Sequence, residues 1–92
     1  MYEEIEAMVS GTVQGVRFRD FVQTQAGALS VLGQVENLPD GTVRIIAQGS
    51  PEVLKALIDT LHEGSVLARV EQVAVTWRAP TRTFVDFSII YP

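Results

Sequence analysis

Hydrophobic positions along the chain follow two spacings, one typical of strands and one typical of helices. From Ile5 to Val13, apolar residues and Gly11 occupy every second position, with Glu6, Met8, Ser10 and Thr12 between them. This period of two predicts a strand with one buried face. From about Arg19 to Leu32, the apolar pattern recurs every three or four positions, at Phe18, Phe21, Val22, Ala26 and Leu29. That spacing predicts an amphipathic helix bounded by Gly33.

Turn residues divide the middle of the chain into a hairpin and a second helix. Pro39-Asp40-Gly41 is strong turn chemistry, and it separates short strands that we predict over residues 33–37 and 42–48. Ser50 and Pro51 fit the N-cap and the first position of a helix. The apolar stripe of this helix consists of Leu54, Leu57, Ile58 and Leu61, and the pattern predicts its end near Glu63, before Gly64.

Two further strands complete the order of elements and predict the fold class. Val70, Val73, Val75 and Trp77 indicate a fourth strand with a local irregularity, and Val85, Phe87, Ile89 and Tyr91 alternate strictly in a last strand. The order is therefore β-α-β-β-α-β with one additional C-terminal strand. We expect an α+β, ferredoxin-like sandwich with both helices on one face of an antiparallel sheet. No linker or repeat interrupts the pattern, which predicts a single domain over residues 1–92.

The segment from Gly11 to Arg19 leaves the first strand, turns at Gly15 and enters the first helix with Arg17 and Arg19 attached. The N-terminus of a helix has free backbone N–H groups and a partial positive charge, which together favour an anion. Arginine can add a planar fork of donors to phosphate oxygens. The segment lacks the Gly-Lys-Ser/Thr of a nucleotide-binding loop. It predicts a phosphate site; in the alternative interpretation, Gly15 only makes a turn and both arginines are solvated.

Composition limits the class of partner and the compartment. Seven Lys and Arg against eleven Asp and Glu give a net charge of −4, which opposes long-range attraction to nucleic acid. Phosphate attraction must therefore be local. The chain has no Cys, which excludes disulfides and thiol catalysis and fits a reducing compartment. It opens with Met1-Tyr2-Glu3-Glu4 and has no apolar run of about 18 residues, so we expect a cytoplasmic protein that does not enter membranes.

Residue types that carry other phosphate chemistry are scarce. The single histidine, His62, falls near the end of the second helix, where we expect an exposed or capping role. The carboxylates show no metal-ligand spacing, so we expect neither a metal nor another cofactor. Four aromatic residues, Trp77, Phe84, Phe87 and Tyr91, could stack on RNA bases, but alternate positions in strands favour packing roles.

Motifs along nearly the whole chain resemble the acylphosphatase family, small enzymes that hydrolyse carboxyl-phosphate anhydrides. They are Gly11-x-Val13-Gln14-Gly15-Val16-x-Phe18-Arg19, Ala28-Leu29, Gly33-x-Val35-x-Asn37, Asp40-Gly41-x-Val43, Gly49 and Trp77. The resemblance implies that Arg19 binds the substrate phosphate and that Asn37 holds the attacking water. It also implies that loop amides cradle the phosphate oxygens, from Gln14, Gly15, Val16, Arg17, Phe18 and Arg19.

The resemblance also implies the partners of the protein. The substrate would be a small-molecule acyl phosphate, with inorganic phosphate as product and inhibitor, and the chain would act as a monomer without nucleic acid or membrane. Two plainer interpretations stay open: Asn37 only forms a turn beside Pro39, and Arg17 is a solvated neighbour of Arg19. The competing function is a non-catalytic anion-binding or regulatory module, like the acylphosphatase-like domains at the start of hydrogenase-maturation carbamoyltransferases.

Three positions depart from the family pattern. Ser30 stands where glycine is common, and a left-handed backbone at that position would be strained by a side chain. Ser65-Val66 replaces a turn that frequently contains Pro, and Ile90 replaces a frequent Arg that would tether the C-terminus near the site. None of these changes removes a group with an expected catalytic role, so they bear on stability more than on activity.

Overall fold

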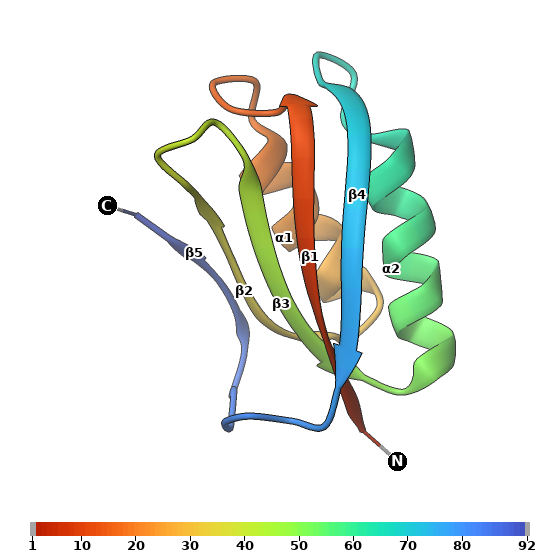
Figure 1. Ribbon diagram of the computed structural model, residues 1–92. Helices are drawn as coiled ribbons and strands as arrows, with labels where there is room; N and C mark the ends of the chain where they lie inside the picture. Colours follow the sequence, from red (N-terminus) through yellow and green to blue (C-terminus); the bar gives the residue numbers. More distant parts are fainter. Residues whose placement is uncertain (1, 92) are drawn as a thin grey trace.

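The order of helices and strands is the predicted one (Figure 1). The computed structural model describes residues 2–91, so Met1 and Pro92 of the predicted domain lie outside the described residues. The strands are β1 (Glu3–Thr12), β2 (Leu32–Asn37), β3 (Val43–Gly49), β4 (Arg69–Arg78) and β5 (Phe87–Ile90), and the helices are α1 (Phe18–Ala28) and α2 (Pro51–Glu63).

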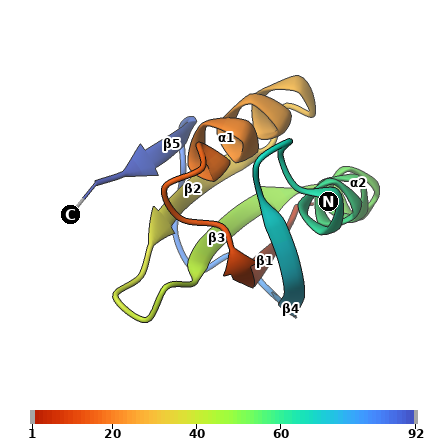
Figure 2. The same cartoon turned by 90° about the horizontal axis from the view of Figure 1, so that it is seen from above.

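The five strands form one open sheet in the order β4-β1-β3-β2-β5. Neighbouring strands pair antiparallel except β2 and β5, which run parallel. This exception arises because the chain crosses under one end of the sheet after β4 and enters the far edge in the direction of β2 (Figure 1). Both helices cover the same face (Figure 2). The predicted ferredoxin-like sandwich is therefore confirmed, with a sheet that is mostly antiparallel.

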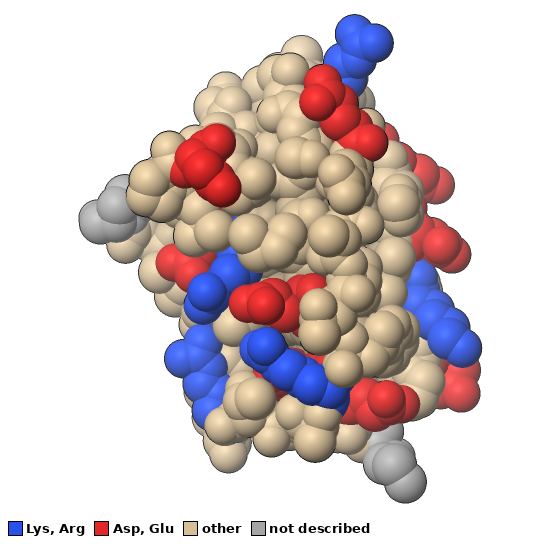
Figure 3. All heavy atoms as spheres, in the orientation of Figure 1, with Lys and Arg blue, Asp and Glu red and all other residues tan. Residues whose placement is uncertain are grey.

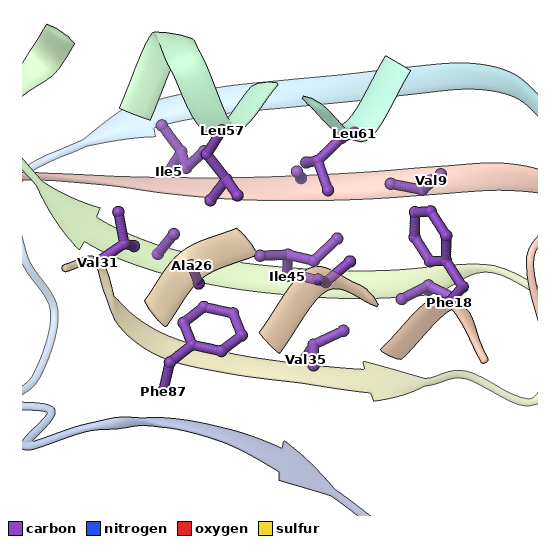
Figure 4. Close-up of a cluster of buried hydrophobic side chains, with 14 of the residues drawn as sticks. Ile5, Val9, Phe18, Ala26, Val31, Val35, Ile45, Leu57, Leu61 and Phe87 are labelled. Atoms are coloured by element: carbon purple, nitrogen blue, oxygen red, sulfur yellow. The ribbon is translucent and has the colours of Figure 1, made fainter. Parts of the chain in front are cut away.

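The core lies between the sheet and the two helices, where the two sequence periods meet. Alternate residues of β1, Ile5, Ala7 and Val9, are fully buried on the helix side. The apolar stripes of the helices pack on them, with Leu57 of α2 and Phe18 of α1 in the same cluster (Figure 4). Because Phe18 is the first residue of α1, this packing fixes the start of the helix relative to the end of β1.

The first helix is shorter than the apolar pattern predicts, since α1 ends at Ala28 and not at Leu32. Ser30 has a left-handed φ of 55°. The N–H groups of Ser30 and Val31 then donate back to the carbonyls of Gly27 (3.1 Å) and Ala26 (2.9 Å), which forms a Schellman motif. The apolar spacing typical of a helix continues beyond Ala28 because Val31 and Leu32 are apolar residues at the entry to β2.

The fourth strand has the predicted irregularity and the last strand is shorter than predicted. Ser10 pairs with Gln72 and Gly11 with Val70, so Glu71 is the extra residue of a bulge in β4. The last strand, β5, covers only residues 87–90, and the expected strand residues Val85 and Tyr91 lie outside it. Both are largely exposed. Alternation alone could not mark these ends, because neither side chain enters the core.

Glu4 is fully buried at the end of β1 remote from the β1–α1 loop. Its carboxylate accepts hydrogen bonds from the side chains of Gln48 (2.8 Å), Arg78 (2.5 Å) and Thr81 (2.8 Å), and from the Thr81 N–H (3.2 Å). Burial raises the pKa of a carboxyl group, but these donors outweigh it and lower the pKa of Glu4 from 4.5 to about 2. The cluster holds the β4–β5 connection against β1 and β3.

The face of the sheet that the helices leave open carries charges of both signs (Figure 3). Arg44 lies 3.6 Å from a carboxylate oxygen of Glu6 and 3.3 Å from one of Glu36. Two of the four aromatic residues considered for RNA stacking lie elsewhere: Phe87 is packed in the core, and Tyr91 lies past the end of β5. These two residues therefore do not form a stacking surface for single-stranded RNA on this face.

Candidate active site

The β1–α1 loop has left-handed backbone at two alternate positions. Gly15 has φ 74° and Arg17, the N-cap of α1, has φ 61°. Alternation of this kind turns successive N–H groups toward one side and makes a concave site for an anion. A side chain in the left-handed region costs roughly 1–2 kcal/mol, so Arg17 marks a backbone that its surroundings hold in place. The sequence carries no signal for this conformation at Arg17.

A pocket of about 270 Å³ opens beside this loop at the N-terminus of α1. The lining residues are Val13, Gly15, Arg17, Phe18, Arg19, Asp20, Asn37 and Tyr91. The structure thus brings together Gly15, Arg17, Phe18, Arg19 and Asn37, all of which the sequence analysis selected. Val16 lines a neighbouring pocket and Gln14 a third one.

Arg19 presents an uncompensated donor in this pocket. Its side chain is half-buried, and the Nη1 atom is buried without a hydrogen-bond partner among residues 2–91. The guanidinium lies over the ring of Tyr91, 4.8 Å from the centroid. Buried donors are nearly always paired in proteins, so an unpaired guanidinium nitrogen at a pocket points to an anionic ligand.

Asn37 presents an unpaired acceptor to the same pocket. It is the last residue of β2, and its Oδ1 atom is buried without a hydrogen-bond partner in the described part of the chain. The side chain of Gln14 donates to the carbonyls of Leu38 and Thr42, both at 2.8 Å. Gln14 therefore ties the phosphate loop to the hairpin that carries Asn37, and this fixes the two halves of the site relative to each other.

The hairpin after Asn37 is stabilised from within. Asp40 accepts hydrogen bonds from the N–H (3.0 Å) and the hydroxyl (2.6 Å) of Thr42. These bonds lower the pKa of the Asp40 carboxyl group below its usual value. The Asx-type turn limits the movement of the residues that follow Asn37.

Tyr91 belongs to the pocket although the sequence analysis treated it only as an aromatic strand residue. Strands β2 and β5 run parallel, and Glu36 lies opposite Ile90. Asn37 and Tyr91 are the next residues after this pair, so both follow at the same edge of the sheet. The useful signal was that two strands with the same direction end at the same edge of the sheet. It was hidden because the sequence predicted an antiparallel sheet and gave no direction for the additional C-terminal strand.

Among residues 2–91, Asp20 is the only acidic residue that lines the pocket beside the β1–α1 loop. Within residues 2–91, no three His, Asp or Glu side chains gather closely enough to hold a metal ion. His62 is exposed in the last turn of α2, as expected. No helix in the described range has the length and apolarity to cross a membrane.

Sequence comparison gives the family. The model of the Acylphosphatase family matches residues 5–89. The chain belongs to the acylphosphatase family. An acylphosphatase of Methanococcoides burtonii is 46% identical over 84 residues, which cover 91% of this chain and 88% of that protein. The predicted family is confirmed, and the class of enzyme with it.

Structural comparison agrees with this assignment. The crystal structure of an acylphosphatase from Bacillus subtilis matches with a TM-score of 0.94 at 35% identity, covering 97% of this chain and 99% of that one. The crystal structure of a HypF from T. kodakarensis matches with a TM-score of 0.85 at 29% identity. That match covers 96% of this chain but only 12% of the HypF chain, so the same unit also occurs within much longer proteins.

Proposed function

We propose that this acylphosphatase family member hydrolyses small-molecule acyl phosphates to a carboxylate and inorganic phosphate. The supporting observation is a pair of buried polar atoms, Arg19 Nη1 and Asn37 Oδ1, that have no partner among residues 2–91. Both residues line one pocket beside a loop with left-handed backbone. One atom is a cationic donor suited to phosphate, and the other is an acceptor suited to a water molecule.

The phosphate group occupies the concave loop in this mechanism. Backbone amides from Gln14 to Arg19 and the Arg19 guanidinium neutralise its oxygens, and they stabilise the charge that spreads over the phosphoryl group in the transition state. The left-handed conformations of Gly15 and Arg17 support this role for the amides. The Gln14 side chain acts on the site through the hairpin, where it bonds to the Leu38 and Thr42 carbonyls.

Asn37 orients the nucleophile. Its Oδ1 accepts a hydrogen bond from one water, which attacks phosphorus in line with the bridging oxygen. A bond forms between the water oxygen and phosphorus, the bond from phosphorus to the acyl oxygen breaks, and its electron pair leaves with the carboxylate. The proton lost by the water passes to a phosphate oxygen of the substrate.

The leaving group explains why the proposed mechanism has no general acid. A carboxylate is weakly basic, so it departs without a proton, whereas the alkoxide of a phosphate monoester would need one. Positioning and charge stabilisation are then the main tasks of the protein. Arg19, Asn37 and the loop amides can perform both.

A phosphate-release assay tests this function against a non-catalytic anion-binding module. We expect turnover of acetyl phosphate and benzoyl phosphate with a chelator present, and little turnover of glycerol 3-phosphate, a monoester with an alkoxide leaving group. Binding of inorganic phosphate without turnover of any acyl phosphate would favour the regulatory module. Equal rates on acyl phosphates and the monoester, or loss of all activity with chelator, would contradict the proposal.

The same protein preparation tests the remaining expectations. Inorganic phosphate should inhibit competitively because product and substrate share the loop. Sedimentation should give a monomer, since the proposed site is complete within one chain. Fractionation of cells should place the protein in the cytoplasm.

A further inference from the structure

A second pocket, of about 450 Å³, adjoins the phosphate pocket. Its apolar walls come from Val16 in the loop, Phe21 in α1, and Val66 and Leu67 between α2 and β4. Val66 is 100% exposed and Leu67 is 69% exposed. Water contact with two large apolar side chains at a pocket is unfavourable, and an apolar ligand would relieve it.

The two pockets are adjacent. Arg17 and Asp20 line both of them, so the apolar groove begins where the phosphate pocket ends. The β1–α1 loop and the α2–β4 connection lie at the same end of the molecule (Figures 1 and 2). A ligand that places its phosphate in the loop can therefore extend directly into the groove.

Asn37 lies on the other side of the phosphate pocket. It lines the phosphate pocket and a third one of about 410 Å³ next to the β2–β3 hairpin, but it does not line the apolar groove. In Figures 1 and 2 the β1–α1 loop lies between that hairpin and the α2–β4 connection. The proposed water and the apolar groove thus flank the phosphate site from different directions.

In-line displacement decides which direction the acyl group takes. The leaving oxygen departs from the face of phosphorus opposite to the attacking water. A water held by Asn37 therefore directs the acyl group away from the hairpin, toward Arg17, Asp20 and the groove. We propose that the groove formed by Val16, Phe21, Val66 and Leu67 is the acyl subsite and makes the enzyme prefer acyl phosphates with an uncharged, apolar acyl group. This inference rests on the proposed function.

The first experiment measures kcat/KM for acetyl, butyryl and hexanoyl phosphate. For the natural chain, we expect a rise of about fivefold to tenfold from acetyl to butyryl phosphate, because two more methylene groups leave water. The double variant Val66→Ser, Leu67→Ser should lose this rise. Val85→Ser, at an apolar residue that is 87% exposed on the β4–β5 connection, should keep the rise.

The second experiment measures binding without turnover. In β-ketophosphonates a CH₂ group replaces the bridging oxygen, so calorimetry can follow the same chain-length series without hydrolysis. For the natural chain and for Val85→Ser, we expect the ketophosphonate affinity to rise by about fivefold to tenfold over the same increase in chain length. For the double variant, we expect no rise in affinity. If acyl phosphates are not hydrolysed but this series tightens, the proposed function is wrong and the subsite stands.

The subsite would be overturned by a natural chain whose ketophosphonate affinities do not depend on chain length, or by a double variant that keeps the dependence. If the natural chain self-associates in sedimentation and the double variant does not, while the dependence on chain length persists, the groove belongs to a second copy of the chain. Circular dichroism of each variant checks that the exposed substitutions leave the fold intact.

Discussion

Both ends of the sheet have buried polar groups, but they differ in how these groups are paired. At the start of β1, the Glu4 carboxylate accepts four hydrogen bonds from Gln48, Arg78 and Thr81. At the other end, Arg19 Nη1 and Asn37 Oδ1 are buried with no partner among residues 2–91. Buried polar atoms are costly unless they are paired. The first cluster is therefore complete within the chain, and the second has two unpaired atoms that a ligand could pair.

The difference in pairing distinguishes a polar cluster that stabilises the fold from polar groups at the proposed phosphate site. A shifted pKa alone would not distinguish them, because the pKa of Glu4 is lowered to about 2 although Glu4 lies far from the β1–α1 loop. A perturbed pKa is a useful pointer to function only when the group also faces a cavity. The pairing of buried atoms and the position of the pocket together support the proposed site.

The largest expected effect follows from removing the cationic donor. Arg19→Ala should lower kcat/KM by about a thousandfold, because the arginine binds the phosphoryl group most tightly in the transition state. Phosphate at about ten times its Kd should stabilise the natural chain by about 1.4 kcal/mol, and this protection should disappear in Arg19→Ala. Enzyme assays and thermal melts with phosphate measure both effects.

Arg17→Ala is the matched control for this prediction. Arg17 is exposed at the mouth of the same pocket, so its screened charge should contribute only about 0–1 kcal/mol. Equal losses in the two variants would show that general positive charge, rather than one oriented guanidinium, holds the phosphate. Retention of phosphate protection in both folded variants would place the anion elsewhere.

Removing the acceptor should affect the rate more than binding. Asn37→Ala should lower kcat by about a hundredfold to a thousandfold, in the range found for single groups that act in the transition state. Phosphate should still raise the melting temperature, since Asn37 makes no contact with the anion in this mechanism. Normal turnover by the variant would mean that Asn37 only forms the turn beside Pro39.

The completed cluster should instead control stability and its dependence on pH. Because the pKa of Glu4 is lowered from 4.5 to about 2, the ionised group stabilises the fold above about pH 4.5. That contribution is lost as the pH falls from about 4.5 to about 2. Glu4→Gln should therefore destabilise the protein at neutral pH by about 2–3 kcal/mol and flatten the pH dependence in this window.

Urea unfolding at several pH values measures this effect, with Glu3→Gln as the control that removes the same charge one residue earlier. Glu3→Gln should change stability by less than about 0.5 kcal/mol and keep the acid-induced loss. The activity of folded Glu4→Gln should stay near that of the natural chain. A strong loss of kcat in Glu4→Gln would show that the Glu4 cluster also affects catalysis, which would contradict a purely structural role for it.

Sequence reasoning predicted the parts of the fold that depend on periodic burial. The alternation in β1 and the apolar stripe of α2 each mark a face that packs in one core, so their positions followed directly. It also selected the β1–α1 loop as a phosphate site from its glycine and its position at a helix start, whereas the roles of Arg19 and Asn37 came from the resemblance to the family and stay predictions. The bulge at Glu71 was visible as a break in alternation.

The parts that it missed depend on long-range pairing. The carboxylate of Glu4 meets Thr81 only through folding, and polar residues that satisfy each other leave no periodic pattern in the sequence. Tyr91 reaches Arg19 because β5 runs parallel to β2, whereas the sequence predicted an antiparallel sheet. The left-handed Arg17 is held by its surroundings against its own preference, so no local propensity could predict it.

The smallest expected effect is a change in stability from a substitution outside both the Glu4 cluster and the phosphate pocket. Ser30 has a φ of 55° at the position after the C-cap of α1, and its side chain is exposed. Ser30→Gly should remove the strain of the left-handed conformation and stabilise the protein by about 0.5–1 kcal/mol, partly offset by the greater freedom of glycine in the unfolded chain. For a domain of this size the melting temperature should rise by about 2–6 °C.

Ala28→Gly, two residues earlier in the last turn of the helix, should have the opposite effect on stability. There the backbone is helical, so glycine should destabilise by about 1 kcal/mol. Neither variant should change kcat or the protection by phosphate, which would show that activity responds to the unpaired atoms and not to stability as such. A melting temperature that falls in Ser30→Gly would mean that the serine side chain stabilises the helix end by contacts that outweigh the backbone strain.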